Sequence, residues 1–183
     1  MSSEITYHRA KSIEELKAIL KLQKENLRDL ISDEVKQKEG FVTLRHDFDL
    51  LKKMNDACGH SIAKCNGDVV GYALSMLQQF KKDIPLLIPM FTEIDKTLKV
   101  QNLTINYIVM GQICIAKRVR GKGVFRELYN YMAGELKYDF EAIITEVDTS
   151  NTRSSNAHKA VGFKVLKNYT SNNQLWEIIS LEI

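Results

Sequence analysis

The clearest chemical signal is a run of glycines and basic residues at positions 120–126, Arg-Gly-Lys-Gly-Val-Phe-Arg. It follows an apolar strand pattern at 105–116 and opens a helical pattern at 124–138. Such a turn aims several backbone N–H groups at one point, where the helix dipole adds partial positive charge. Three side chains add further positive charge: Arg120, Lys122 and Arg126. Because Gly121 and Gly123 carry no Cβ atom, a phosphate can approach closely, and the run predicts a site for an anionic diphosphate.

Two common phosphate-binding motifs do not fit this run. The chain has no GxxxxGK(S/T) sequence, which excludes a Walker A loop, and no GxGxxG sequence, which excludes the dinucleotide-binding fingerprint. From the turn alone, a plain tight turn with solvated basic side chains stays open as the alternative.

The flanking sequence predicts strands and helices that position the turn. Before it, strand patterns occur at 5–10, 61–65, 69–77 and 105–116, and helical patterns at about 12–30 and 44–58. Ser12 and Glu15 have the spacing of a capping box, and Asn66-Gly67 is a strong hairpin signal. After the turn, the patterns indicate a helix at 124–138, a buried strand at 142–147, a helix at 151–161 and a closing hairpin at 164–169 and 175–183.

The order of these elements defines the expected fold class. Antiparallel strands come first and one βαβ unit follows, which predicts an α+β or mixed α/β sheet and not a doubly wound fold. Residues 80–104, with two prolines and a mixed apolar run, predict an insertion with a short helix. The 183 residues fit a single domain, 1–183.

Composition excludes several functional classes. A net charge of +3, without a basic stripe interleaved with aromatics, argues against a nucleic-acid partner. The three cysteines lack a CxxC spacing, so we expect no metal site and a reducing, cytoplasmic location. We expect neither a signal peptide nor a membrane span, because the start has no basic region before an apolar stretch and no apolar run approaches ~18 residues.

Two motifs resemble the signatures of the GNAT acetyltransferase family. Residues 113–126 are similar to its first signature, Q/R-x-x-G-x-G/A, with Arg120 and Gly123 matching and Phe125 standing where the family has a small residue. About thirty residues later, 151–163 resembles the second signature, NxxAxxLYxxxGF. Asn151 matches there, and His158 stands where the family often has tyrosine. The resemblance spans most of the chain except 80–104.

The resemblance implies a fold and a cofactor. The fold would be a twisted, mostly antiparallel sheet of six to seven strands, flanked by about four helices, with the fourth and fifth strands splayed apart. Acetyl-CoA would lie in that gap as the acetyl donor, and no metal would be needed. The residues expected to bind it are Ile113, Ile115, Arg120, Gly121, Lys122, Gly123, Val124, Phe125, Arg126 and Asn151.

Transfer to an amine needs two proton transfers, and the resemblance suggests a residue for each. The amine must lose a proton, for which Glu146 is the candidate base, and the leaving thiolate benefits from an acid. His158 is the candidate acid, and we expect a nearby anion such as Glu146 to raise its pKa towards neutrality. Tyr169 and Tyr72 are the alternative acids. Cys114 is interpreted as a small buried hydrophobic residue.

Three functions stay open at this point. The first is an N-acetyltransferase that acts on a primary amine of a small molecule or of a protein or peptide. The second is a catalytically silent GNAT-like module that binds acyl-CoA and regulates a partner, and the third is a nucleotide-phosphate binder. In the first case we expect the 80–104 insertion, through Glu93 and Asp95, to border the amine pocket. The sequence does not decide whether the chain forms a homodimer.

Overall fold

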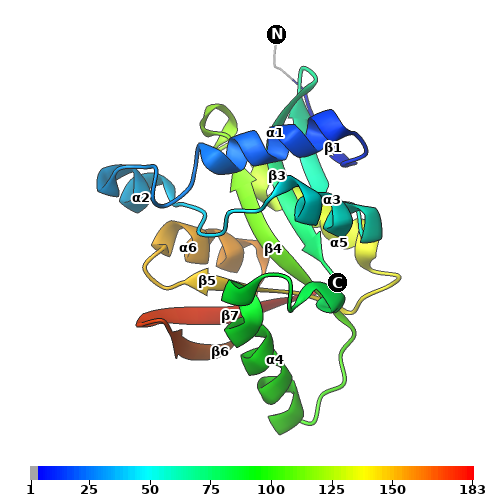
Figure 1. The fold of residues 1–183 in the computed structure, drawn as a ribbon, viewed down its shortest axis with the longest axis vertical. Coiled ribbons are helices and arrows are strands. Elements are labelled where there is room, and N and C mark those ends of the chain that lie inside the picture. The colour runs from blue at the N-terminus through cyan, green and yellow to red at the C-terminus, as the bar shows by residue number, and fades with distance from the viewer. Residues whose placement is uncertain (1–3) are drawn as a thin grey trace.

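The structure, a computed structural model, describes residues 4–183 and is built around one seven-stranded sheet (Figure 1). Its strand order is β1-β2-β3-β4-β5-β7-β6. The strands are β1 (Ile5–Arg9), β2 (Ser61–Cys65), β3 (Asp68–Met76), β4 (Tyr107–Ile115), β5 (Ala142–Asp148), β6 (Lys164–Ser171) and β7 (Gln174–Glu182). Only β4 and β5 are parallel among these neighbours, so the mostly antiparallel α+β sheet predicted from the sequence is confirmed.

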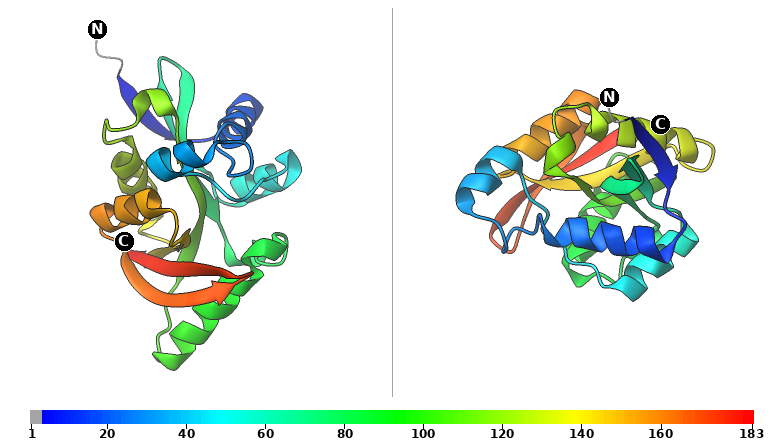
Figure 2. Two further views of the ribbon diagram at one scale, coloured as in Figure 1. Left: turned by 90° about the vertical axis from the view of Figure 1, so that its left-hand side faces the viewer. Right: turned by 90° about the horizontal axis from the view of Figure 1, so that it is seen from above.

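Six α-helices lie within the described residues, where the sequence predicted about four. They are α1 (Ile13–Lys24), α2 (Asp33–Glu39), α3 (Phe48–Ala57), α4 (Ile88–Val100), α5 (Val124–Leu136) and α6 (Thr152–Val161). α1 and α3 cover one face of the sheet, and α5 and α6 cover the other (Figure 2, right view). α4 belongs to the predicted insertion and packs against β6. None of the helices in residues 4–183 is both long and apolar enough to cross a membrane.

Local sequence signals account for several element boundaries. The capping box at α1 forms as predicted, because Ser12 Oγ accepts from the Glu15 N–H at 3.2 Å and Glu15 Oε2 accepts from the Ser12 N–H at 3.0 Å. The hairpin between β2 and β3 turns at Asn66 and Gly67, with φ angles of 52° and 88°. Positive φ at both positions is what a tight hairpin needs, and Asn-Gly adopts it most readily.

Two predicted helix boundaries were wrong. The first helix ends at Lys24 instead of continuing to about residue 30, because the chain beyond it pairs with a distant segment. There the Arg28 N–H donates to the Val42 carbonyl at 2.9 Å, which buries Leu27 in a bridge and not on a helix face. The predicted 44–58 helix begins only at Phe48, where Asp47 caps the Leu50 N–H at 2.8 Å.

β4 and β5 separate halfway along their length. Their parallel pairing covers only three residue pairs, from Tyr107↔Ala142 to Val109↔Ile144. Just beyond it, Thr145 Oγ1 donates to the Met110 carbonyl at 2.8 Å, so that a side chain replaces the next ladder bond. The register between β3 and β4 shifts at the same level, which indicates a bulge in β4. The expected splay between the fourth and fifth strands is therefore present, and it opens the sheet where chemistry was predicted.

Candidate active site

The glycine turn leaves the first amides of α5 open to a ligand. Gly123 is the N-cap residue in the left-handed region, with φ 79°, and Gly121 has φ 75°. A Cβ atom at either glycine would meet no atom within 4 Å, so the space before the helix is free. No side chain caps α5, whereas side-chain oxygens cap the start of α1, α2, α3 and α6. Because α5 lacks such a partner, its N–H groups and dipole can bind an anion.

A cavity of about 330 Å³, called here the loop cavity, lies in front of these amides. Its walls come from the turn, the end of β4, residues 39–42 and α6. Most of the predicted cofactor-binding residues line it: Ile113, Ile115, Arg120, Gly121, Gly123, Val124, Phe125, Arg126 and Asn151. Lys122 is not part of the lining. The structure thus brings nine of the ten residues that the resemblance assigned to the cofactor around one cavity.

The Arg120 side chain turns back into the protein. Its Nη1 lies 2.5 Å from Glu39 Oε2, its Nη2 donates to Asn26 Oδ1 at 2.6 Å, and its Nε donates to the Ile115 carbonyl at 2.9 Å. Glu39 also pairs with Lys117 at 2.7 Å. These bonds hold the turn against α2 and engage the Arg120 guanidinium within the protein. The backbone amides at the start of α5 have no side-chain cap and stay open to an anion.

Asn151 joins α6 to the opposite wall of the loop cavity. Its Oδ1 accepts from the Ser154 N–H at 3.2 Å, which caps α6, and its Nδ2 donates to the Phe41 carbonyl at 3.1 Å. A Cβ on Gly40 would approach Asn151 Oδ1 to 3.0 Å, so this contact favours a glycine there. Asn151 thus fixes the spacing between α6 and the segment 41–47.

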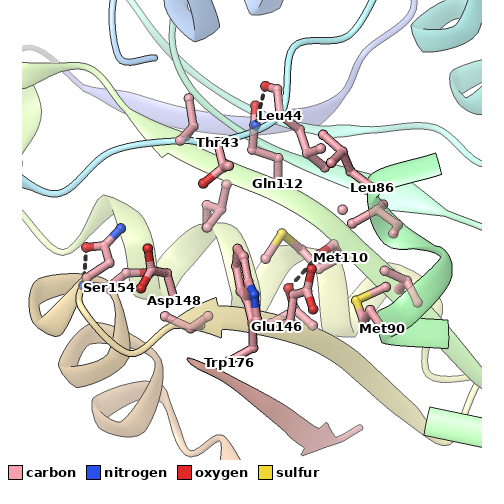
Figure 3. A pocket seen from close by; sticks show the side chains of 18 of the residues that line it. Thr43, Leu44, Leu86, Met90, Met110, Gln112, Glu146, Asp148, Ser154 and Trp176 are labelled. Atoms are coloured by element: carbon pink, nitrogen blue, oxygen red, sulfur yellow. Dashed lines mark hydrogen bonds between the residues drawn. The ribbon is translucent and has the colours of Figure 1, made fainter. Parts of the chain in front are cut away.

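A second cavity, called here the splay cavity, lies between the separated strands and measures about 130 Å³ (Figure 3). β4 supplies Gln112 and β5 supplies Glu146, while Leu86 and Met90 of the insertion and Trp176 of β7 form further walls. The splay and loop cavities share several lining residues: Phe41, Val42, Ile113, Asn151 and Ser154. The two cavities therefore adjoin across the gap between β4 and β5.

Glu146 has the properties of a base that works near neutral pH. It lies on β5 within the splay cavity, where burial raises the pKa of its carboxyl group to about 7 and a hydrogen bond from Tyr169 partly opposes that rise. The Tyr169 hydroxyl donates to Glu146 Oε2 from β6, across β7. A carboxyl group with this pKa exchanges a proton readily at physiological pH.

His158 lies deeper than the sequence suggested. It is 2% exposed and packs edge-on against Phe125 and Phe163. Its Nδ1 donates to the Ser154 carbonyl at 2.8 Å, so Nε2 carries no proton and accepts from the Tyr129 hydroxyl at 2.8 Å. Burial lowers the pKa of His158 to about 4. The expectation that a nearby anion raises this pKa was wrong, because desolvation outweighs every other influence on the ring.

A buried polar network that the sequence did not reveal holds the segment 41–47 over the splay cavity. Gln112 Nε2 donates to the Leu44 carbonyl at 2.8 Å, and the His46 N–H donates to Gln23 Oε1 at 2.9 Å. Gln23 Nε2 and the Tyr72 hydroxyl both donate to Gln112 Oε1, at 2.9 and 2.6 Å. In the sequence, the two glutamines stand among the apolar residues of α1 and β4. Tyr72 is therefore a support for Gln112, and burial raises its pKa well above the usual value.

Part of the insertion borders the splay cavity. Leu86, Leu87 and Met90 line it, as the sequence suggested for this segment. The two acidic residues chosen from the sequence, Glu93 and Asp95, do not line it. Glu93 pairs with Lys96 at 2.7 Å and Asp95 with Lys81 at 3.7 Å. Within residues 4–183, no group of three or more His, Cys, Asp or Glu side chains is arranged to hold a metal ion.

Several solved acetyltransferases share this fold at low sequence identity. Arabidopsis thaliana Naa50, in complex with the bisubstrate analogue CoA-Ac-MVNAL, is 14% identical with a TM-score of 0.63, over 98% of this chain and 99% of that one. The Salmonella typhimurium protein yncA, with its cofactor acetyl-CoA, is 14% identical with a TM-score of 0.62, over 97% and 93%. An N-acetyltransferase from Staphylococcus aureus Mu50 is 19% identical with a TM-score of 0.63, over 98% and 99%. These likenesses confirm the predicted fold.

Family membership follows from a separate comparison. A search of curated proteins gives no match. The model of the acetyltransferase (GNAT) family matches residues 24–163, which is well over half of the chain. That span contains the glycine turn, Glu146 and the whole of the second signature. The resemblance carried by the two signatures is thereby confirmed, and the chain belongs to the GNAT acetyltransferase family.

Proposed function

We propose that this protein transfers the acetyl group of acetyl-CoA directly to a primary amine. One observation carries the proposal: Glu146, a carboxyl group with a pKa near 7, lies in a cavity that adjoins the anion-binding turn at the point where β4 and β5 separate. Membership of the family shows an acetyltransferase. The proposal adds the kind of acceptor, a primary amine, and the role of Glu146.

The loop cavity fits the donor. Its diphosphate would accept hydrogen bonds from the first amides of α5, where Gly121 and Gly123 leave the space open. From Met110 onward, β4 has no ladder partner on its β5 side. Backbone groups near Ile113 and Ile115 can therefore pair with the extended amide arm of the donor, and Asn151 stands at the opposite wall.

Glu146 would start the reaction by taking a proton from the bound ammonium group. A typical aliphatic amine, with a pKa of ~10, is mostly protonated at neutral pH and cannot attack until this proton leaves. The free amine nitrogen then forms a bond to the thioester carbonyl carbon, and the carbon–sulfur bond breaks with its electron pair passing to sulfur. The nitrogen then loses its second proton, this proton passes to the sulfur, and the products are the acetylated amine and the thiol of CoA.

Direct transfer is favoured over an acetylated enzyme. The cysteine nearest to the gap is Cys114, whose pKa is raised to about 12 by burial. Since a thiolate and not a thiol is the effective nucleophile, Cys114 is poorly suited to carry the acetyl group. We therefore expect Cys114→Ser to retain the acetyl-transfer pathway.

The acid that protonates the thiolate stays a prediction, with His158 as its candidate. The neutral ring would have to turn its Nδ1 proton from the Ser154 carbonyl towards sulfur. If it does, His158→Gln should lower kcat by ~10²-fold at unchanged KM for acetyl-CoA, because glutamine can accept from Tyr129 but is no acid. His158→Tyr should recover part of the rate. A His158→Gln enzyme with wild-type kcat and unchanged melting temperature would assign His158 to packing alone.

A silent acyl-CoA-binding module is the second candidate, because both nitrogens of His158 are engaged within the protein. Two measurements separate the candidates. Thermal stabilisation by CoA but not by ATP is expected for both the enzyme and the silent module, and it excludes a general nucleotide-phosphate binder. Release of free thiol from acetyl-CoA that depends on an added amine is expected only for the enzyme.

A further inference from the structure

The splay cavity has a compact apolar end. Leu87, Met90 and Met110 are 4% exposed or less, and together with Trp176 they enclose the space beside Glu146. The whole splay cavity measures about 130 Å³, close to an engineered apolar cavity of ~150 Å³ that binds benzene. Its apolar end therefore has room for a group no larger than a leucine side chain or a phenyl ring.

The ionisable side chains that line the splay cavity include acids but, within residues 4–183, no lysine or arginine. They are Glu146, Asp148, His158 and Tyr169. Asp148 is already neutralised, because it pairs with Arg28 at 3.3 Å and accepts from the Ser150 N–H at 2.8 Å. Arg28 also lies over the Phe41 ring, 5.0 Å from its centroid. No cation of the cavity is thus available to a bound anion.

This charge pattern discriminates between amines. A cationic ammonium group is attracted by Glu146 once that carboxyl group has lost its proton. A carboxylate or phosphate next to the amine would meet the same negative charge with no cation to pair with it, and a partly buried unpaired charge is costly. Free amino acids and phosphorylated amino sugars carry such anionic groups, so the cavity disfavours both.

We infer that the acceptor is a primary amine with a compact apolar group near the nitrogen and no carboxylate or phosphate beside it. The inference rests on the proposed function and narrows its substrate class. Two kinds of molecule carry such an amine. One is a free alkyl- or arylalkylamine, and the other is a polypeptide whose N-terminal residue is large and apolar. In the second source the carboxyl group is held in an amide bond and carries no charge.

The decisive comparison is leucinol against leucine, with acetyl-CoA as donor. The two acceptors have the same side chain and amines of similar basicity, and they differ in the carboxylate. We expect kcat/KM to be higher for leucinol by ~10²-fold or more, the size expected when a charge is left without a partner. Two further acceptors distinguish the sources. Faster acetylation of isoamylamine identifies a free amine as the acceptor, and faster acetylation of a peptide amide that begins with leucine identifies a polypeptide N-terminus. Spermidine, which lacks the apolar group, should be a poor acceptor.

A variant at the rim of the cavity provides an independent test. Leu86 is 58% exposed and lines the cavity, so a change there should not disturb the core. Leu86→Arg supplies the missing cation and should reduce the preference for leucinol over leucine by at least ~10-fold, while the matched neutral variant Leu86→Gln should keep it. Unchanged preference in the arginine variant counts against the inference.

The outcomes distinguish the inference from the function on which it rests. Acetylation of leucine as efficient as that of leucinol, or a preference for spermidine, overturns the inference and leaves the acetyltransferase intact. If a folded protein that binds CoA releases no thiol from acetyl-CoA with any of the amines, both the inference and the proposed function are overturned.

Discussion

Replacing Glu146 with glutamine is expected to lower kcat/KM for the amine by ~10³-fold, within the usual range for loss of a general base. Glutamine keeps the shape of the side chain but cannot take a proton. In the wild-type enzyme, activity should rise with pH through about 7 as the Glu146 carboxyl group loses its proton. This limb of the kcat/KM profile should be absent in the variant. Binding of CoA, measured by calorimetry, should not change.

Tyr169→Phe is the matched control for this assignment. The Tyr169 hydroxyl donates to the Glu146 carboxylate and lowers the Glu146 pKa, so its removal should move the acidic limb of the profile to higher pH. A Tyr169→Phe profile that coincides with the wild type, or a fully active Glu146→Gln enzyme, would remove Glu146 from the mechanism.

The same carboxyl group should also lower the stability of the fold as the pH rises from acidic to neutral values. Its folded-state pKa of about 7 is above the value of ~4.3 for an unfolded glutamate. The folded state therefore holds the proton more tightly, and stability is lost as pH rises from about 4.3 through about 7. Glutamine has no proton to lose, so the melting temperature of Glu146→Gln should fall less than that of the wild type between pH 5 and pH 8.

Gly123→Asp is expected to weaken CoA binding by at least ~10²-fold, because it places a negative charge where helix amides would hold the diphosphate. Gly123→Asn is the matched control. Gly123 has φ 79°, a conformation that asparagine and aspartate tolerate better than other side chains, and the two side chains have the same shape. The asparagine variant should therefore lose much less affinity than the aspartate variant. Equal affinities for the two variants, by calorimetry, would place the diphosphate elsewhere.

Local signals made the turn and much of the sheet predictable. Asn66-Gly67 specifies a hairpin through its own backbone preferences, and Ser12 and Glu15 form a cap within one helical turn. Gly121 and Gly123 mark a close approach whatever lies opposite them. Glu146 was identifiable as a candidate only through the family resemblance, which places a carboxylate at this point of the strand.

The rest depends on partners that are distant in the sequence. Arg120 looks like a free phosphate ligand until Glu39, 81 residues away, is seen to bind it. Gln23 and Gln112 are separated by 89 residues, so nothing local indicates that they hold the segment 41–47 together. The second signature singles out His158, but it does not show the burial that lowers the pKa of His158, to which the packing of Phe125 and Phe163 contributes.

The most direct test of the whole account is transfer of an isotope-labelled acetyl group from acetyl-CoA to isoamylamine, followed by mass spectrometry. The wild-type protein should yield N-acetylated amine and free CoA in equal amounts, and Glu146→Gln should bind CoA normally but transfer very little. A folded wild-type protein that binds acetyl-CoA yet acetylates neither isoamylamine nor any other amine tested would contradict the account.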